Sequence, residues 1–442
     1  MVEPMASELL SLPPDTFVEF LEDAGIERFW FVHDESAGTV RASHELIQPI
    51  ADALAEDRRD FLGHEGLFFR VTPEHRTLQG AFVHRTWRGQ AAGGARWWYY
   101  DDLQAYLRDG LRLAVGMTRK NALAGLWWGG GKGVMARSAA VDPEDPEVRA
   151  YLYRAYGEFI TSLRGCYVTA EDVGTNVSDM ARVFERTRFT TCIPPELGGS
   201  GNPSIPTARG VVAGIEAALE LLGLGTIEGK SIAVQGIGNV GAALIGFLFQ
   251  RGAAKIIAGD IDPRHVARVR EAHPGSALEV RILASNDASI LSAPCDVLSP
   301  CATGAVLNPE TIPAIRARVV CGAANNQLED SERDDRALHE RGILYVPDFL
   351  VNRMGIVTCA DEQAGVVPHD PLVERHLSPA WEHSIPRTLA DVVEVSRKTG
   401  QPPGKVATAI ADRLSLQPHP IFGRRGREII AGLVADRWHE RG

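Results

Sequence analysis

The most constraining feature of the sequence is a glycine-rich turn between an apolar strand and an apolar helix. Residues 231–235 (SIAVQ) run directly into residues 236–241 (GIGNVG), and an apolar segment continues to Phe249. In such a turn the first glycine permits the tight bend, the second lets a pyrophosphate approach the backbone, and the third lets helix and strand pack closely. A second predicted strand ends at Asp260, 19 residues after Gly241. This order predicts a dinucleotide-binding Rossmann unit, with the acid on a ribose 2′-hydroxyl.

The same unit indicates which dinucleotide binds. The predicted cofactor contacts in it are Gly236, Gly238, Asn239, Val240, Gly241 and Asp260. The carboxylate of Asp260 would repel a 2′-phosphate, which favours NAD over NADP. Arg264 is close enough in the sequence to keep NADP as a minor alternative.

Short apolar strands alternate with helices through the second half of the chain, which predicts βαβ units and a parallel sheet covered on both faces. The predicted strands there are 232–235, 255–259, 280–283, 296–298, 318–321 and 344–346. Elsewhere the patterns predict strands at 28–32 and 80–83 and helices at 46–61, 101–117, 148–163 and 207–222.

We therefore predict an α/β protein with two domains and a cleft between them. Residues 1–204 would form a substrate-binding and assembly domain, and residues 205–400 the Rossmann domain. The last helices, in about 401–442, would return to the first domain. Closure of one domain on the other would expel water from the cleft.

Composition excludes several other classes of protein. Asp and Glu (57) outnumber Lys and Arg (46), giving a net charge of −11, so no nucleic-acid partner is expected. No window approaches the roughly 18 uninterrupted apolar residues of a membrane span. The 13 histidines show no HExxH motif or paired Cys/His spacing, so no metal site is predicted. With six scattered cysteines and no basic, apolar start, the expected location is the cytoplasm.

Two lysines and an aspartate are candidates for chemistry. Lys132 lies in the glycine run GGGKG (129–133), where desolvation would lower its pKa toward neutrality and suit it to acid–base work. A solvated lysine on a surface turn is an equally good interpretation. Lys120 precedes it by 12 residues, and the apolar stretch between them argues against a wet linker. Asp172 belongs to TAEDVGT (169–175), for which a helix cap is the alternative.

Taken together, these residues resemble the amino-acid dehydrogenase family of glutamate, leucine, phenylalanine and valine dehydrogenases, in particular its leucine and phenylalanine branch. The resemblance runs from about Gly93 to Glu362, and more loosely to the end. It rests on several segments in family order: GGARWWYYD (93–101), MTRKNALAGLWWGGGKGV (117–134), TAEDVGT (169–175), GSGNPS (199–204), VQGIGNVG (234–241), CATGA (301–305) and GAANNQL (322–328).

The resemblance implies an NAD-dependent oxidative deamination of an L-amino acid to the 2-oxo acid and ammonia, and the reverse reductive amination. Carried over by position, Lys120 holds the substrate carboxylate, Lys132 acts with a water as the acid–base residue, and Asp172 is its proton-handling partner. Gly93 is implied in substrate binding, and the amide of Asn326 near substrate and nicotinamide. The further cofactor contacts implied are Ala302, Thr303 and Asn325. Family members are homo-oligomers, which implies assembly of identical subunits here.

The resemblance also bears on the side chain of the substrate. Glutamate dehydrogenases carry a lysine just before the GG-x-R motif; this chain has Ala92 there, so a second buried carboxylate is disfavoured. The branch's other side-chain positions are Ala170, Ile356 and Cys359. Leucine dehydrogenases tend to have bulkier aliphatics at two of these positions, so we expect a roomier apolar pocket for an aromatic or long aliphatic side chain. Three large residues are alternatives for filling that space: Trp127, Trp128 and Met354.

Three departures from the family pattern leave alternatives open. Arg353 and Met354 replace two small residues, Arg119 takes a place often held by an uncharged residue, and about 30 extra residues (41–72) separate the first predicted strands. A repacked helix start would account for Arg353 and Met354 without any change in chemistry. Otherwise the same hydride chemistry would serve a bulky non-standard amino acid or imine of secondary metabolism, or the protein would be a non-catalytic NAD-binding regulator.

Overall fold

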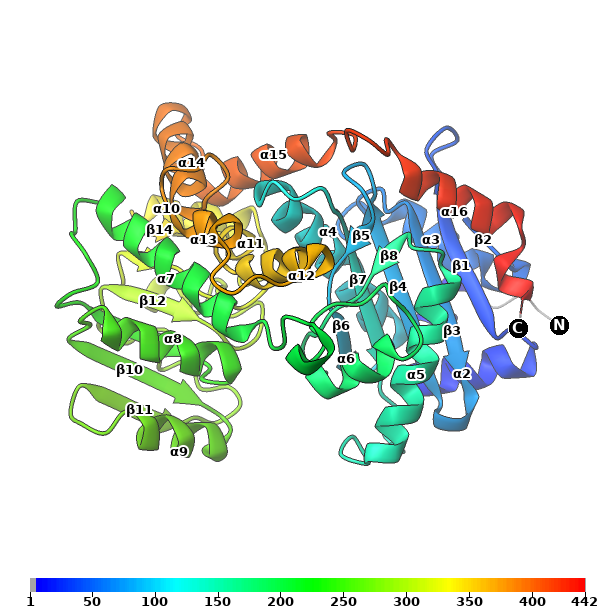
Figure 1. The fold of residues 1–442 in the computed structure, drawn as a ribbon, viewed down its shortest axis with the longest axis horizontal. Coiled ribbons are helices and arrows are strands. Elements are labelled where there is room, and N and C mark those ends of the chain that lie inside the picture. The colour runs from blue at the N-terminus through cyan, green and yellow to red at the C-terminus, as the bar shows by residue number, and fades with distance from the viewer. Residues whose placement is uncertain (1–4, 442) are drawn as a thin grey trace.

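The computed structural model describes residues 5–441. Two β-sheets lie side by side in the molecule, and helices cover both faces of each (Figure 1). The first sheet uses residues from the first 170 positions and the second uses residues 231–345. This two-part α/β architecture is the predicted fold class.

The first sheet has eight strands in the order β2-β1-β3-β4-β7-β5-β8, with β6 paired to β7. Neighbours from β2 to β7 run antiparallel, whereas β5 and β6 run parallel to β7. The strands are β1 (Arg28–Asp34), β2 (Thr39–Ala42), β3 (Gly66–Thr72), β4 (Thr77–Arg85), β5 (Ala91–Ala92), β6 (Ala95–Trp98), β7 (Gly129–Ala136) and β8 (Tyr167–Val168).

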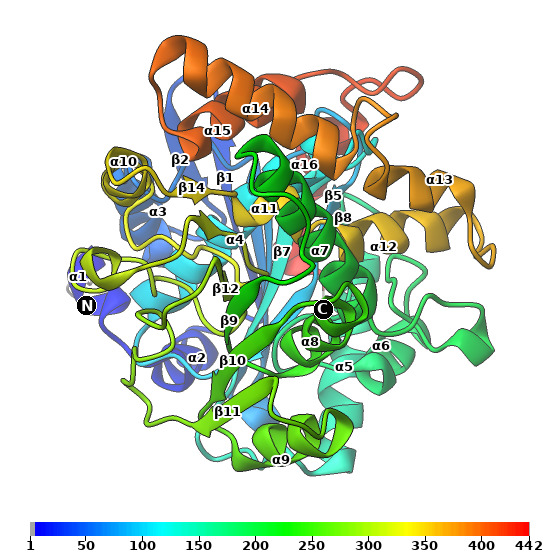
Figure 2. The same cartoon turned by 90° about the vertical axis from the view of Figure 1, so that its left-hand side faces the viewer.

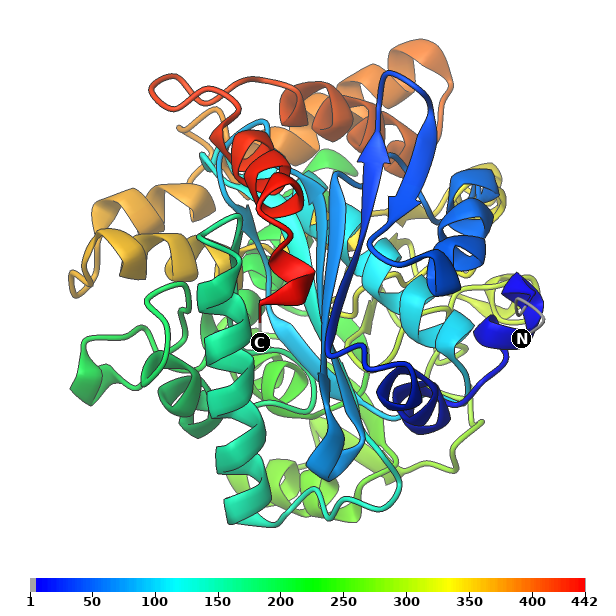
Figure 3. The same ribbon diagram turned by 90° about the vertical axis from the view of Figure 1, so that its right-hand side faces the viewer.

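Helices cover both faces of this sheet because its strands carry apolar side chains on both sides. Phe29 and Phe31 join one core, and Trp30 between them joins the other. In Figure 3 the blue and cyan helices lie on one side, and the green-blue α5 and the red C-terminal helix lie on the other. The helices are α1 (Ala6–Leu10), α2 (Pro14–Asp23), α3 (Gln48–Glu56), α4 (Leu103–Leu123), α5 (Pro146–Ser162), α6 (Val177–Phe184) and, from the end of the chain, α16 (Arg425–Ala435).

The glycine run around Lys132 forms β7, a fully buried strand at the centre of the first sheet. The surface-turn interpretation is therefore wrong. The glycines let α4 and its neighbours approach the strand closely: a Cβ on Gly130 would lie 2.4 Å from the Cα of Thr118, and one on Gly133 would lie 2.1 Å from the Tyr156 hydroxyl. Glycine is thus required by packing, and it brings the backbone of α4 against the strand that carries Lys132.

Two helix ends and one segment in this half differ from the predictions. The helix predicted at 46–61 ends at Glu56, because the Asp57 carboxylate accepts the N–H groups of Arg59 and Asp60 and turns the chain. The helix predicted to end at residue 117 continues to Leu123. The 41–72 segment is not simply an added connection, since it contains α3 and all of β3.

The second sheet is entirely parallel, with the order β11-β10-β9-β12-β13-β14 (Figure 2). Numbered along the chain this is the 3-2-1-4-5-6 order of a Rossmann fold. The strands are β9 (Ser231–Gln235), β10 (Lys255–Asp260), β11 (Leu278–Ile282), β12 (Val297–Pro300), β13 (Val319–Val320) and β14 (Leu344–Tyr345). Each of the six strands predicted for this half is present, within three residues at either end.

The remaining helices surround this sheet and connect it to the first one. They are α7 (Ser204–Leu221), α8 (Asn239–Gln250), α9 (Pro263–Ala272), α10 (Arg333–Glu340), α11 (Asp348–Val351), α12 (Met354–Ala364), α13 (Pro371–Glu374), α14 (Ile385–Thr399) and α15 (Pro403–Ser415). Short 3₁₀ helices are η1 (Glu45–Ile47), η2 (Pro73–His75), η3 (Pro195–Leu197), η4 (Ile312–Ala314), η5 (Arg375–Leu377) and η6 (Trp438–Glu440). None of the helices in residues 5–441 combines the length and apolar character needed to cross a bilayer.

The C-terminal helices contact the first half of the molecule. In α15, Asp412 accepts hydrogen bonds from Arg119 of α4, with Arg119 Nε 3.0 Å from Asp412 Oδ1. Farther along, Leu433 of α16 and the buried Trp438 pack on the first sheet, the latter edge-on to Phe68. Arg119, one of the departures from the family pattern, therefore joins α4 to α15.

Candidate active site

Lys132 and Asp172 form a buried ion pair. Lys132 extends from β7, and its Nζ lies 2.9 Å from Asp172 Oδ2. Asp172 is in the loop after β8, where its backbone N–H donates to the Thr175 hydroxyl at 2.8 Å. The helix-cap interpretation of Asp172 is wrong, because the cap of α6 is Asn176. The carboxylate is directed instead at the lysine.

Arg96 holds the other side of the Asp172 carboxylate. Its Nε lies 3.3 Å from Asp172 Oδ2, and its Nη1 donates to Asp109 at 3.0 Å. Tyr100 completes the chain by donating its hydroxyl to Asp109 at 2.6 Å. Arg96 was not predicted as a site residue, although it is the arginine of the GG-x-R motif and that position was a usable signal. The row of alternating charges holds the Asp172 carboxylate in place.

These charges set the protonation states of the pair. Burial lowers the pKa of Lys132, and the neighbouring Asp172 carboxylate partly opposes that shift. Burial also disfavours ionisation of Asp172, but the charges of Lys132 and Arg96 outweigh it and hold the pKa of that carboxyl well below its usual range. Asp172 is therefore an anion throughout the neutral range, beside a lysine that releases its proton more readily than one in water.

A second polar cluster surrounds Lys120 in the last turn of α4. Its Nζ lies 3.5 Å from Asn325 Oδ1, which also accepts a 2.9 Å hydrogen bond from Asn352 Nδ2. Burial lowers the pKa of Lys120 to about 8, against the attraction of Asp348. The charges of Lys132 and Asp172 also act on Lys120, so the two clusters are close to each other.

The two neighbouring asparagines differ in their surroundings. Asn325, predicted as a cofactor contact, directs its side chain at Lys120. Asn326, predicted near substrate and nicotinamide, is exposed and has a left-handed backbone (φ +53°). Its N–H donates to the Asp348 carboxylate at 2.8 Å. Asp348 thus supports an unfavourable backbone conformation beside the lysine, a role that no sequence motif had indicated.

The predicted side-chain positions gather in one apolar cluster. Ala92, Ala170, Ile356 and Cys359 are all buried in it, and Cys359 is close enough to Lys120 to act on the charge of that lysine. Gly93, next to Ala92, admits no side chain, since a Cβ there would lie 2.0 Å from the Gly131 carbonyl oxygen.

Cys192 belongs to the same cluster and was missed by sequence reasoning. Its Sγ lies 3.3 Å from Cys359 Sγ, and its backbone has a left-handed φ of +60°. The Glu362 carboxylate of α12 accepts the Cys192 N–H at 2.8 Å and the Ser200 hydroxyl at 2.6 Å. A lone cysteine in the sequence TTCIPP carries no local signal for such a position, which depends on α12 packing against this loop.

Arg353 and Met354 lie outside this apolar cluster. Met354 packs between α12 and α7, where a Cβ on Gly210 would lie 2.9 Å from its Cγ. Arg353 is fully buried and donates from Nη2 to the His383 carbonyl. Both placements support the repacked-helix interpretation over one in which these side chains contact substrate. Trp127, in turn, is substantially exposed rather than filling the cluster.

The glycine-rich turn has the shape that a dinucleotide pyrophosphate requires. Gly236 has a φ of +86°, and a Cβ there would lie 2.6 Å from Ala302. A Cβ on Gly241 would lie 2.0 Å from the Gly236 carbonyl, whereas Gly238 has only His265 nearby, at 3.8 Å. The turn is therefore tight on its inner side and open at Gly238, where α8 begins with Asn239 and Val240. Thr303, after Ala302, is exposed.

Asp260 is at the end of β10 beside this turn. Its Oδ2 accepts the Ile237 N–H at 2.7 Å, and its Oδ1 accepts the Asp262 N–H at 2.9 Å. Arg264 is turned to Asp262, 2.7 Å away, and its side chain is 89% exposed. The arginine that kept NADP open is thus already paired with an acid.

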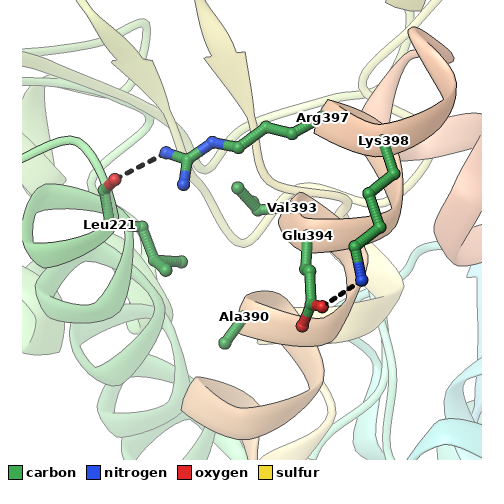
Figure 4. A pocket seen from close by; sticks show the side chains of 6 residues that line it. All are labelled: Leu221, Ala390, Val393, Glu394, Arg397 and Lys398. Carbon is green, nitrogen blue, oxygen red and sulfur yellow. Dashed lines mark hydrogen bonds and ion pairs between the residues drawn. The ribbon is translucent and has the colours of Figure 1, made fainter.

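Other candidate locations carry no comparable chemistry. A surface hollow between α7 and α14 is lined by Leu221, Val393 and charged residues of α14 (Figure 4). Its charged side chains already have partners: Glu394 pairs with Lys398, and Arg397 donates to the Leu221 carbonyl. None of the predicted site residues lines it. Within residues 5–441 no group of three His, Cys, Asp or Glu side chains is arranged to hold a metal ion.

Comparison with known proteins identifies the family of this chain. The model of the Glu/Leu/Phe/Val dehydrogenase dimerisation domain matches residues 72–189, and that of glutamate/leucine/phenylalanine/valine dehydrogenase matches residues 198–412. Leucine dehydrogenase of Bacillus cereus is 43% identical over 335 residues, 75% of this chain and 84% of that protein. Phenylalanine dehydrogenase of Lysinibacillus sphaericus is 38% identical, covering 68% of this chain and 77% of that protein.

A solved structure agrees as well. L-tryptophan dehydrogenase from Nostoc punctiforme matches with a TM-score of 0.62 and 31% identity, over 80% of this chain and 96% of that one. The sequence resemblance is confirmed. From its two matched models, its relatives and its fold, the chain belongs to the glutamate/leucine/phenylalanine/valine dehydrogenase family.

Proposed function

We propose that this protein catalyses the NAD-dependent oxidative deamination of an apolar L-amino acid to its 2-oxo acid and ammonia, and the reverse reductive amination. The observation that carries the proposal is the buried Lys132–Asp172 pair, which lies close to Lys120 and borders an apolar cluster. The leucine, phenylalanine and tryptophan dehydrogenases named above support the same substrate class.

Each charged residue of the site has a separate role in the proposed reaction. Lys120 binds the substrate carboxylate, which replaces the amide oxygen of Asn325 as its partner. The Asp172 anion stabilises the positive charge that develops on the substrate nitrogen as Cα loses hydride. Lys132, in its neutral form, takes a proton from the water that attacks Cα of the iminium and returns it to the nitrogen of the carbinolamine that forms. Ammonia then leaves as the carbinolamine hydroxyl gives its proton to Lys132 and becomes the oxo group. The nicotinamide, when bound, supplies the hydride acceptor.

The cofactor is NAD in this proposal. The glycine-rich turn would hold the pyrophosphate, with Ala302, Thr303 and Asn325 lining the path to the cleft. Asp260 would accept hydrogen bonds from the adenosine ribose and repel a 2′-phosphate. Arg264 is turned to Asp262, which supports the choice of NAD. The name of the matched dimerisation domain supports a homo-oligomer.

The first test is NADH formation by the purified protein with Leu, Val, Phe, Trp and Glu at mildly alkaline pH, with NAD and NADP compared. We expect apolar amino acids to exceed glutamate in kcat/KM by at least about a hundredfold, because a second buried carboxylate would have no cation to pair with. NAD should exceed NADP. Glutamate as the best substrate would contradict the proposal. NAD binding with no turnover of any amino or oxo acid would favour a regulator or a specialised substrate.

Cys192 gives a second prediction, about the size of the pocket. Cys192→Gly removes a side chain packed against Cys359 and also relieves the left-handed backbone, so the variant should remain folded. We expect the kcat/KM ratio of Phe or Trp to Leu to rise about tenfold, in line with the effect of one or two heavy atoms in an apolar pocket. The control is Cys321→Ala, at a buried thiol directly after β13 of the second sheet. A ratio that stays within twofold of wild type would contradict the prediction.

A further inference from the structure

Arg353 is a buried cation without a counter-ion. Its exposed fraction is 0%, and Nη2 donates to the His383 carbonyl. Its Nε and Nη1 have no hydrogen-bond partner, and no carboxylate of the described residues lies within ion-pair distance. Arg96 lies between two carboxylates and Arg149 is paired with Asp179. The buried Arg88 also lacks a carboxylate, but it donates to the Leu126 and Leu414 carbonyls and to the Gln417 amide oxygen. A buried unpaired charge is strongly destabilising, so this arrangement requires an explanation.

Deprotonation of Arg353 does not explain how the buried side chain is tolerated. Burial alone lowers the pKa of Arg353 to about 9, so the side chain remains charged at neutral pH. Burying a charged guanidinium is tolerated in proteins when an anion or several acceptors surround it. The chain supplies one acceptor, the His383 carbonyl.

The neighbouring groups add donors and positive charge. His376 is 3% exposed, and its Nδ1 has no partner. Burial, together with the charge of Arg353, lowers the pKa of His376 to about 3, so its imidazole is neutral and one ring nitrogen carries a proton to donate. The charge of Arg375 acts on both His376 and His383. Glu382, an acid close to this group, is 81% exposed and lies 3.8 Å from His383.

We propose that Arg353 and His376 form a binding site for a compact oxyanion such as inorganic phosphate. The unpartnered atoms are two nitrogens of the guanidinium, which are donors, and Nδ1 of the imidazole, which is a donor in one of the two neutral tautomers. An ion with several acceptor oxygens matches these atoms better than a halide. The site lies beneath His383, whose side chain is 34% exposed, and Trp381, which packs against both histidines.

The site lies behind the Lys120 cluster and is distinct from it. Arg353 directly follows Asn352, whose amide binds Asn325. His383 packs on Gly125 just beyond α4, the helix that carries Lys120. The proposal goes beyond the proposed catalytic function and does not depend on it, since it concerns only ion binding by the folded chain.

The test is thermal unfolding of the full chain during a titration with sodium phosphate at neutral pH, with sodium chloride at equal ionic strength as the reference. We expect a saturable rise of the midpoint by about 2 °C or more for wild type, from preferential binding to the native state. Arg353→Met should abolish the rise and should itself be no less stable than wild type without phosphate, because it removes the unpaired charge. Arg209→Met is the matched control, since Arg209 of α7 is paired with Glu374; it should keep the full response.

Two results would overturn the site: no phosphate-specific rise in wild type, or the same rise in Arg353→Met. The second would mean that phosphate acts elsewhere, at the glycine-rich turn or by general exclusion from the surface. If Arg353→Met does not fold, Arg353→Lys keeps the charge with fewer donors and should raise the half-saturating phosphate concentration about tenfold. An unchanged half-saturating concentration in that variant would also overturn the proposal.

Discussion

Replacing Lys132 with methionine is expected to lower kcat for an apolar amino acid by about 10³–10⁴-fold, the contribution of a positioned acid–base group. Methionine keeps most of the side-chain volume in β7, and Arg96 remains as the counter-ion of Asp172. The fold and NAD binding should therefore survive, because the glycine-rich turn belongs to the other sheet. Steady-state NADH formation, together with NAD affinity measured by calorimetry, checks both parts.

The matched control is Lys255→Met. Lys255 is a half-exposed lysine of β10 paired with Glu279, and its loss should leave kcat within twofold of wild type. Retention of more than a tenth of wild-type kcat in Lys132→Met would remove this lysine from the proposed acid–base role.

Asp172→Asn is expected to lower kcat/KM by about 10³-fold and to move the pH profile of the residual activity to lower pH. Two opposing effects set the sign. Burial lowers the pKa of Lys132 and the Asp172 anion raises it; without that anion the pKa of Lys132 falls further. Deamination needs Lys132 in its neutral form, so the rise of kcat/KM with pH should begin at lower pH in the variant. The profile of kcat/KM between pH 6 and 11 measures this shift.

Asp109→Asn separates a direct contact from an indirect one. Asp109 binds Arg96 but does not contact Lys132. Asp109→Asn should therefore lower kcat/KM by about tenfold or less and shift the pH profile of kcat/KM only slightly. An Asp172→Asn profile that rises at the wild-type pH, or an equal loss in both variants, would contradict a direct role for Asp172 beside the lysine.

Local patterns were sufficient for the second half of the fold. Each of its strands is a short apolar run between turn residues, and the helices between them follow a helical period, so alternation alone predicts a parallel sheet. The glycine-rich turn then identifies the nucleotide-binding edge, since the role of each glycine is a local steric requirement. The structure adds that Asp260 also braces the turn through the Ile237 N–H.

Local patterns were less informative in the first half. Four of the eight residues of β7 are glycine, a residue with low strand propensity, so the sequence pattern allowed a flexible turn there. The close packing of α4 and Tyr156 on it overrides that propensity. Likewise β3 was overlooked within residues 41–72, since a strand buried on both faces shows no alternation of polar and apolar residues.

By itself, the sequence determined the class of fold, the family and the residue types of the cleft, because these depend on motifs of a few neighbouring residues. Only the tertiary structure decided which of those residues meet. Two contacts join segments that are distant in the sequence: the ion pair of Lys132 with Asp172, and the contact of Cys192 with Cys359 across 167 positions. The burial of Arg353 without an acid likewise depends on the segments packed around it. The physical reason is that burial and charge pairing depend on what surrounds a side chain in space, and no local pattern of residues specifies that environment.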